Sequence, residues 1–181
     1  MQPLFIATEP FDPLAGDGWV SFVEWSELSQ LTELVSLDSM MCPSVLREIK
    51  PDYWPHIVNE SYMLHFFTDV PFLLNEISAL VVRKNLLCVF RNPSEEPKVP
   101  AEIAAVELLG YDILDTEACA SALSNCGGFP EVFRNEELTQ HGLIASLKRA
   151  NEIRTNLRNM HPEEHHADCD VWAIFRLPST G

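Results

Sequence analysis

Side chains that bind metal ions gather near the C-terminal end of the sequence. They are His161, His165, His166 and Cys169. Imidazole and thiolate are common zinc ligands, and their four-residue spacing would bring His161, His165 and Cys169 onto one face of a continuous helix. Pro162 interrupts that helix, because its ring clashes with the preceding turn and it has no N–H to donate. We therefore favour a helix exit, a charged loop and a buried cysteine, with no metal or other cofactor. A metal site at these four residues is the alternative.

A second stretch whose residues could carry out catalysis is Asn125–Gly128, in which Cys126 precedes two glycines. Glycine after a nucleophile lets backbone N–H groups approach an oxyanion, so a cysteine hydrolase would pair Cys126 with His141, His165 or His166. The same glycines also suit a tight turn. Reactive cysteines need electropositive surroundings, whereas the chain has a net charge of -15. We expect no catalytic residue. A small metal-binding or cysteine-dependent enzyme that uses Cys126 and the His161–Cys169 cluster is the alternative function.

Every charged side chain before Arg47 is acidic. These residues are Glu9, Asp12, Asp17, Glu24, Glu27, Glu33 and Asp38. Such an anionic field repels nucleic acid and anionic lipid, and it speeds the encounter with a basic protein. We therefore expect neither nucleic-acid nor membrane binding. These acids, with an exposed aromatic patch at Tyr53 and Trp54, are interpreted as the surface for a basic protein partner. In many bacterial-type domains acidity serves solubility alone, which is the simpler interpretation.

Motifs of well-known enzyme classes are absent from the sequence. It contains no phosphate-binding G-x-x-x-x-G-K-S/T, no dinucleotide-binding G-x-G-x-x-G, no G-x-S-x-G and no H-E-x-x-H. The basic residues between Lys148 and Arg158 fit a solvated helix face better than a nucleic-acid site. The hypothesis is a non-enzymatic acidic binding protein that follows the electrostatic logic of immunity proteins or inhibitors of basic toxins. The pattern leaves its oligomeric state open.

Cysteine usage and hydropathy indicate the compartment. The five cysteines are odd in number, scattered, and form no C-x-x-C pair, which is typical of a reducing compartment. No basic and apolar signal opens the sequence, and no apolar run reaches the roughly 18 residues that a membrane span needs. We predict a soluble, cytoplasmic protein.

Period-two patterns and short apolar runs predict the strands. They cover 19–25, 62–67, 85–90, 106–114 and 171–175. Gly110 would bend the fourth strand, although Pro100 and Gly110 would also suit the two ends of a helix. Strands adjacent in sequence often pair, so 86–91 and 106–114 would form a hairpin. The last strand is apolar on both faces and would be central.

Helical spacing and capping residues predict the remaining elements. Helices are expected over 26–36, from Asp69 onward, briefly from Asn135, and over 143–160, with one further turn at 45–49. Residues 1–18 would form an irregular arm. A chain of 181 residues that is 46% hydrophobic fits one globular domain. The sequence predicts a single α+β domain over residues 1–181, with an antiparallel or mixed sheet and helices packed mainly on one face.

Overall fold

The computed structural model describes residues 2–58, 64–78, 83–101, 103, 106–124, 129–163 and 165–178. Its centre is a seven-stranded sheet in the order β2-β3-β1-β4-β7-β5-β6, and every neighbouring pair is antiparallel. The strands are β1 (Leu4–Thr8), β2 (Ile57–Val58), β3 (Phe66–Phe67), β4 (Asn85–Arg91), β5 (Glu107–Asp115), β6 (Ala120–Ser121) and β7 (Asp170–Arg176). The predicted α+β class is confirmed.

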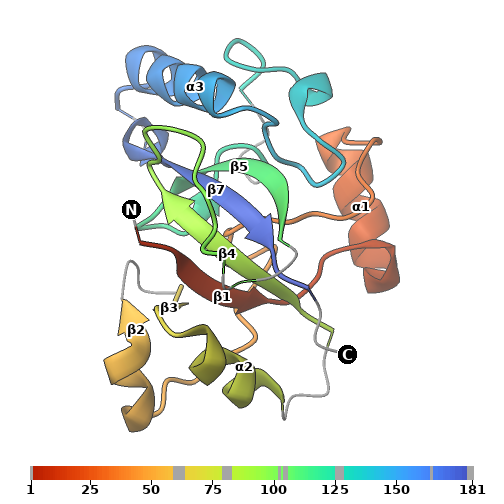
Figure 1. Ribbon diagram of the computed structural model, residues 1–181. Helices are drawn as coiled ribbons and strands as arrows, with labels where there is room; N and C mark the ends of the chain where they lie inside the picture. Colours follow the sequence, from red (N-terminus) through yellow and green to blue (C-terminus); the bar gives the residue numbers. More distant parts are fainter. Residues whose placement is uncertain are drawn as a thin grey trace.

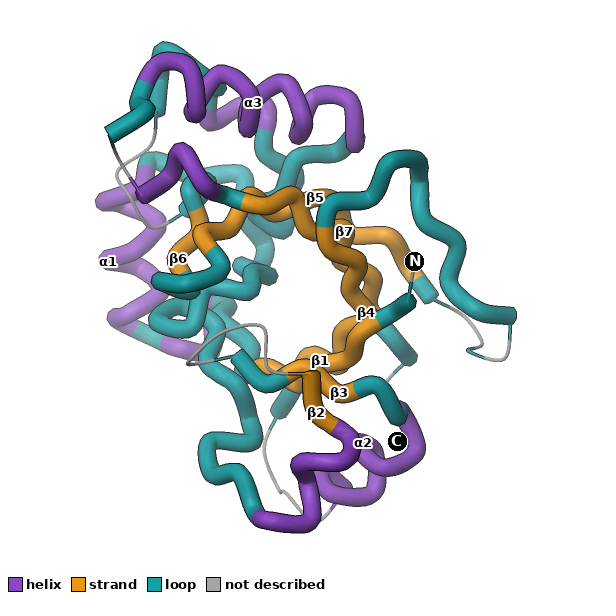
Figure 2. The backbone as a smooth tube through the Cα atoms, turned by 90° about the vertical axis from the view of Figure 1, so that its left-hand side faces the viewer, coloured by secondary structure: helices purple, strands orange, loops and turns teal. Residues whose placement is uncertain are grey.

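Helices surround this sheet on its outer side. They are α1 (Asp17–Ser26), α2 (Val70–Ser78) and α3 (Leu147–Met160), with short 3-10 helices η1 (Pro13–Ala15), η2 (Pro51–His56), η3 (Asn135–Glu137) and η4 (His165–Asp168). Figure 1 shows α3 above the sheet, α1 to its right and α2 below it. Figure 2 shows the strands curling round a common interior, with the three α-helices outside the curve.

The curled sheet is buried on both faces, which gives the protein two hydrophobic cores. Inside the curve, Ile6, Val89 and Trp172 pack together with Val35 and Leu37 from a loop. The outer core holds the alternate strand residues, which pack under the helices. It includes Phe5, Cys88, Phe90, Ala173, Phe175, Leu73 and Ile77 of α2, and Ala150, Ile153 and Leu157 of α3. Successive strand residues point to opposite faces of the sheet, and both faces are buried, so these strands appear in the sequence as continuous apolar runs.

Several predicted elements are confirmed. β7 lies between β4 and β5, and its central residues are buried, so the prediction of a central last strand is correct. α2 begins as predicted, because the Asp69 carboxylate accepts a hydrogen bond of 2.9 Å from the backbone N–H of Phe72. β5 is a strand that bends at Gly110, where φ is 143° and a Cβ would lie 2.8 Å from the carbonyl oxygen of Ile144. Only glycine permits that approach.

Other predictions near the N-terminus are wrong. Residues 19–25 were expected to be a strand but belong to α1, because Trp19 and Phe22 pack together on Phe11 at helical spacing. Residues 26–36 are not a helix. The chain leaves α1 at Glu27 with a φ of 57° and passes through a turn, in which the Leu31 N–H donates to the carbonyl of Leu28. The backbone N–H groups of Leu34 and Val35 then donate to the carbonyls of Phe11 and His141.

The N-terminal arm, the hairpin and some helix ends also need correction. Residues Leu4–Thr8 are not irregular, because they form β1 and pair with both β3 and β4. The hairpin of β4 with β5 is wrong, since β7 lies between them. The expected helical turn at 45–49 is not helical, and the nearby 3-10 helix is η2. The helix expected over 143–160 begins later, at Leu147, where the Ser146 hydroxyl caps α3. Of the strand expected at 62–67, residues 64–67 are described, and only Phe66–Phe67 is a strand, β3. The expected helix from Asn135 is the short η3, where the Glu137 carboxylate accepts a hydrogen bond of 3.0 Å from the backbone N–H of Arg134.

Candidate functional site

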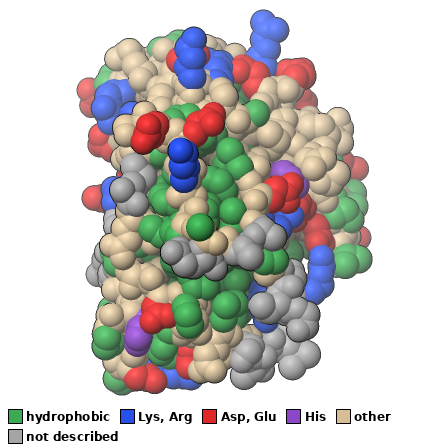
Figure 3. All heavy atoms as spheres, viewed as in Figure 1, with side chains coloured by type: hydrophobic (Ala, Val, Ile, Leu, Met, Phe, Trp, Pro, Cys, Tyr) green, Lys and Arg blue, Asp and Glu red, His purple; other side chains and the backbone are tan. Residues whose placement is uncertain are grey.

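The outward face of α1 combines carboxylates with exposed apolar side chains. Asp17, Val20 and Glu24 fall at three- and four-residue spacings, which places them on one side of the helix, and Trp25 directly follows Glu24. All four are exposed. Val20 and Trp25 are 52% and 59% exposed. The opposite side of α1 is anchored in the core, so the exposed side is held in place. Figure 3 shows hydrophobic and acidic atoms together along the right-hand edge of the molecule, over α1.

Three of the early acids on or next to α1 have carboxylates without a partner in the described part of the chain. Asp17, Glu24 and Glu27 make no hydrogen bond or ion pair with any residue that the structure describes. Glu9 differs, because its carboxylate lies 2.6 Å from a guanidinium nitrogen of Arg47. An exposed pair of this kind contributes little to stability.

Asp12 and Glu33 are ion-paired within the fold. Asp12 is buried, pairs with the guanidinium of Arg83 and accepts a backbone hydrogen bond of 2.9 Å from Leu14. Glu33 Oε1 lies 3.0 Å from His141 Nδ1 and 2.7 Å from a guanidinium nitrogen of Arg176. Contact with the imidazole of His141, followed by the contact with Arg176, holds the pKa of Glu33 below its usual range, despite partial burial. The bond to Arg83 likewise lowers the pKa of Asp12.

Asp38 is fully buried and holds a loop to the β5–β6 hairpin. One carboxylate oxygen accepts hydrogen bonds from the backbone N–H groups of Met40 and Met41, at 2.9 and 3.0 Å. The other accepts from the backbone N–H of Ser121 at 2.9 Å. The Ser121 hydroxyl in turn donates to Asp112 at 2.6 Å. Asp38 therefore contributes to the interior of the fold and is absent from its surface.

Asp112 is the centre of this polar network. It is fully buried in β5, and its second oxygen accepts from the Ser36 hydroxyl at 2.6 Å and the Leu37 backbone at 3.1 Å. Burial raises the pKa of the Asp112 carboxyl, and the hydrogen bonds from Ser121 and Ser36 oppose that effect. Sequence reasoning did not select Asp112, because a single acid within an apolar strand carries no motif.

The two aromatic residues of the predicted patch have different surroundings. Tyr53 is buried in η2, and its hydroxyl donates to Glu76 at 2.6 Å. Trp54 is 54% exposed. η2 directly precedes β2, at the lower end of the molecule in Figure 1, whereas α1 lies at the right. The acidic face and the aromatic residues are therefore not brought together.

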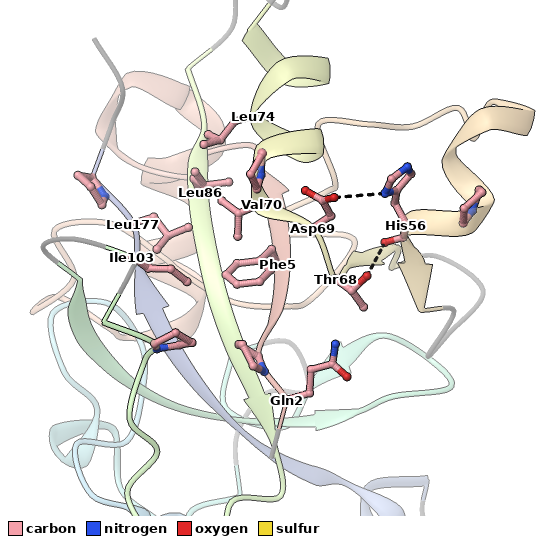
Figure 4. A pocket seen from close by; sticks show the side chains of 15 residues that line it. Gln2, Phe5, His56, Thr68, Asp69, Val70, Leu74, Leu86, Ile103 and Leu177 are labelled. Atoms are coloured by element: carbon pink, nitrogen blue, oxygen red, sulfur yellow. Dashed lines mark hydrogen bonds and ion pairs between the residues drawn. The ribbon is translucent and has the colours of Figure 1, made fainter.

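An apolar groove lies beside η2, between α2 and the sheet (Figure 4). It has a volume of about 890 Å³ and its floor is made by Phe5 and Leu86, with Val70 of α2 at one side. At its polar end, His56 Nδ1 lies 3.6 Å from an Asp69 carboxylate oxygen, and the imidazole stacks on Phe72 with ring centroids 3.8 Å apart. The groove can hold an apolar group that carries a hydrogen-bonding end. Its lining comes from segments far apart in the sequence, so spacing alone could not reveal it.

The histidine cluster near the C-terminal end is spread around an aromatic ring. Phe129 packs against both His161 and His166, with ring centroids 5.1 Å away in each case. His161 Nε2 lies 2.7 Å from Glu131 Oε1, while Cys169 is buried at the start of β7. Among the residues that the structure describes, no three His, Cys, Asp or Glu side chains are grouped as a metal site would require.

The described cysteines are buried free thiols. They are Cys42, Cys88, Cys119 and Cys169. Burial raises the pKa of the Cys42 and Cys88 thiols to about 12, so neither forms a thiolate nucleophile near neutral pH. The predicted turn 125–128 and the alternative nucleophile Cys126 lie outside the described residues.

Comparison of the chain with protein-family models, with curated proteins and with solved structures finds no match. Within the described part of the chain, no helix is both long and apolar enough to cross a membrane. The inference of function therefore rests on the geometry of the sites themselves.

Proposed function

We propose that this protein is a non-enzymatic binding protein, of the immunity or inhibitor kind, that engages a basic protein partner through the exposed face of α1. The observation that carries the proposal is the exposure of Val20 and Trp25 beside the carboxylates of Asp17, Glu24 and Glu27. Interfaces commonly combine an aromatic anchor with a polar rim. A tryptophan that is more than half exposed on an anchored helix supplies such an anchor.

Electrostatics supports a basic partner. Asp17, Glu24 and Glu27 have no compensating cation among the described residues, so their charges are available to an incoming protein. The overall charge of -15 extends the attraction beyond direct contact and raises the rate of encounter. Asp12, Glu33 and Asp38 are excluded from this surface because they are engaged inside the fold.

The experiment is affinity capture with matched variants, followed by measurement on the purified pair. The double variant Asp17→Lys/Glu24→Lys should lose the captured partner, and Trp25→Ala should weaken it by at least about tenfold, as expected for an aromatic anchor. The matched control is Glu95→Lys/Glu163→Lys, which makes the same change of charge at exposed residues outside α1: Glu95 lies between β4 and β5, and Glu163 between α3 and η4. It should retain the partner.

The captured protein should be basic, and its affinity should fall as salt rises, because exposed charges are screened within about 10 Å at 0.1 M salt. A partner that is acidic, or that binds both double variants equally, would overturn the proposal. Retention of partner by the control alone supports it.

A further inference from the structure

The groove beside α2 has an apolar half and a polar half (Figure 4). Its volume of about 890 Å³ lies within the range of roughly 300 to 1,000 Å³ that small-molecule sites occupy. The apolar half is lined by Leu74, Leu86, Ile103 and Leu177. The polar half is lined by His56, Thr68 and Asp69. A ligand that fits both halves is a small amphipathic molecule.

The apolar half is already formed by the packing of the fold. Phe5, Leu86 and Leu177 belong to the outer core, and they are only 3%, 7% and 3% exposed. Five further lining residues are prolines, whose rings fix the backbone φ angle: Pro3, Pro55, Pro71, Pro100 and Pro178. Walls of this kind lose little conformational freedom when a ligand enters, so apolar contact there contributes directly to affinity.

The polar half offers hydrogen-bond acceptors and one carboxylate. The Asp69 side chain is 43% exposed; one of its oxygens accepts from the backbone N–H of Phe72 at 2.9 Å, and the other lies 3.6 Å from His56 Nδ1. The Thr68 hydroxyl donates to the carbonyl oxygen of His56 at 3.4 Å, which leaves its own oxygen able to accept. Neither Lys nor Arg is among the described residues that line the groove. The polar half therefore complements a head group that donates hydrogen bonds and carries positive charge.

We infer that this groove binds a small primary amine with an apolar body. An ammonium group has three N–H donors and the charge opposite to that of Asp69, and the net charge of -15 adds to the attraction. A carboxylate head group would face Asp69 with a like charge, and a hydroxyl group has only one donor and no charge. The inference goes beyond the proposed function, because the groove is separate from the α1 face and its ligand requires no protein partner.

The test is an NMR titration of the whole chain with n-octylammonium, followed at the backbone N–H groups of Val70 and Leu74. The matched probes are 1-octanol and octanoate, which have the same chain and differ only in the head group. We expect saturable shifts with octylammonium, binding of octanol that is about three- to tenfold weaker, and still weaker binding of octanoate.

Asp69→Asn separates the charge from the helix cap. Asparagine caps a helix about as well as aspartate, so the variant should keep the wild-type thermal midpoint. Its affinity for octylammonium should fall about three- to tenfold, while its affinity for octanol stays unchanged. The control is Asp52→Asn, which removes the same charge from an exposed residue of η2 that does not line the groove. It should retain the wild-type affinity for octylammonium.

Leu74→Ala tests the apolar half. The substitution removes apolar surface that the octyl chain contacts, so it should weaken octylammonium and octanol by the same factor. The absence of saturable shifts, binding of octanoate as tight as that of octylammonium, or equal effects of Asp69→Asn and Asp52→Asn would each overturn the inference. Full affinity for both probes in Leu74→Ala would also overturn it.

Discussion

The acids of α1 and those of residues 33–38 have the same charge but differ in their surroundings. Glu24 projects from an exposed helix face without a partner among the described residues, whereas Glu33 contacts Arg176 and His141, and Asp38 binds three backbone N–H groups. Residues 33–38 run against the inner core, where Val35 and Leu37 are buried. Acids there must be satisfied internally, because an unpaired buried charge is costly. Net charge alone therefore overstates the surface that a partner can use.

The largest expected effect is loss of stability on removing Asp38. Asp38→Ala should leave the backbone N–H groups of Met40, Met41 and Ser121 without their acceptor, and should lower the free energy of unfolding by about 3 kcal/mol. Urea denaturation measures this directly. Glu24→Ala is the control and should unfold at the wild-type urea concentration. Similar losses in both variants would erase the distinction between the two groups of acids.

A smaller loss is expected at Glu33. Glu33→Gln removes the charge that faces Arg176 and His141, and should lower the free energy of unfolding by about 1 to 2 kcal/mol. A double-mutant cycle with Arg176→Gln isolates the pair, and we expect a coupling of about 1 kcal/mol. Additive effects of the two substitutions would show that the pair contributes nothing.

The two groups of acids should also separate in their response to pH. The pKa of Glu33 is lower in the folded protein than in the unfolded chain, where a glutamate has a pKa of about 4.3. Its contribution is therefore fully present above that value and is lost as the pH falls through the lower, folded pKa. Stability measured from pH 6 down to about pH 3 should fall less steeply in Glu33→Gln than in the wild type. A wild-type slope in that variant would contradict the assignment.

The smallest effect on stability, and a kinetic effect on binding, is expected at Glu24. Glu24→Gln should keep the wild-type thermal midpoint at neutral pH, because no described residue depends on its carboxylate. The association rate with the basic partner should fall a few-fold at low salt and converge with the wild type at about 0.5 M salt. A change in dissociation rate alone would place Glu24 outside the electrostatic surface.

Sequence reasoning succeeded where local pattern and burial agree. The apolar runs of β4 and β7 and the Asp69 cap of α2 carry their structure within a few residues, so they were predicted. α1 was mistaken for a strand because its aromatic and β-branched residues favour strands, while contacts with Phe11 decide the helix. The order of strands was not predictable from adjacency, because β7 enters between β4 and β5.

Only part of the candidate site was predicted, because tertiary contacts cannot be read from composition. The acids were identified from composition, yet only tertiary contacts separate Glu24 from Asp38. The groove beside α2 joins Phe5 of β1, Val70 of α2 and Leu86 of β4, which lie far apart in the sequence, so no local pattern points to it.

The position of β7 has a consequence for synthesis in the cell. β7 lies between β4 and β5 and pairs with both, although it is synthesised after them. While the ribosome still holds residues 170–176, both edges are open and the Trp172 site in the inner core is empty. Unpaired edges of this kind invite association between nascent chains. The sheet can therefore be completed only after β7 has been synthesised, and slow translation between β5 and β7 would lengthen the time in which aggregation competes with folding.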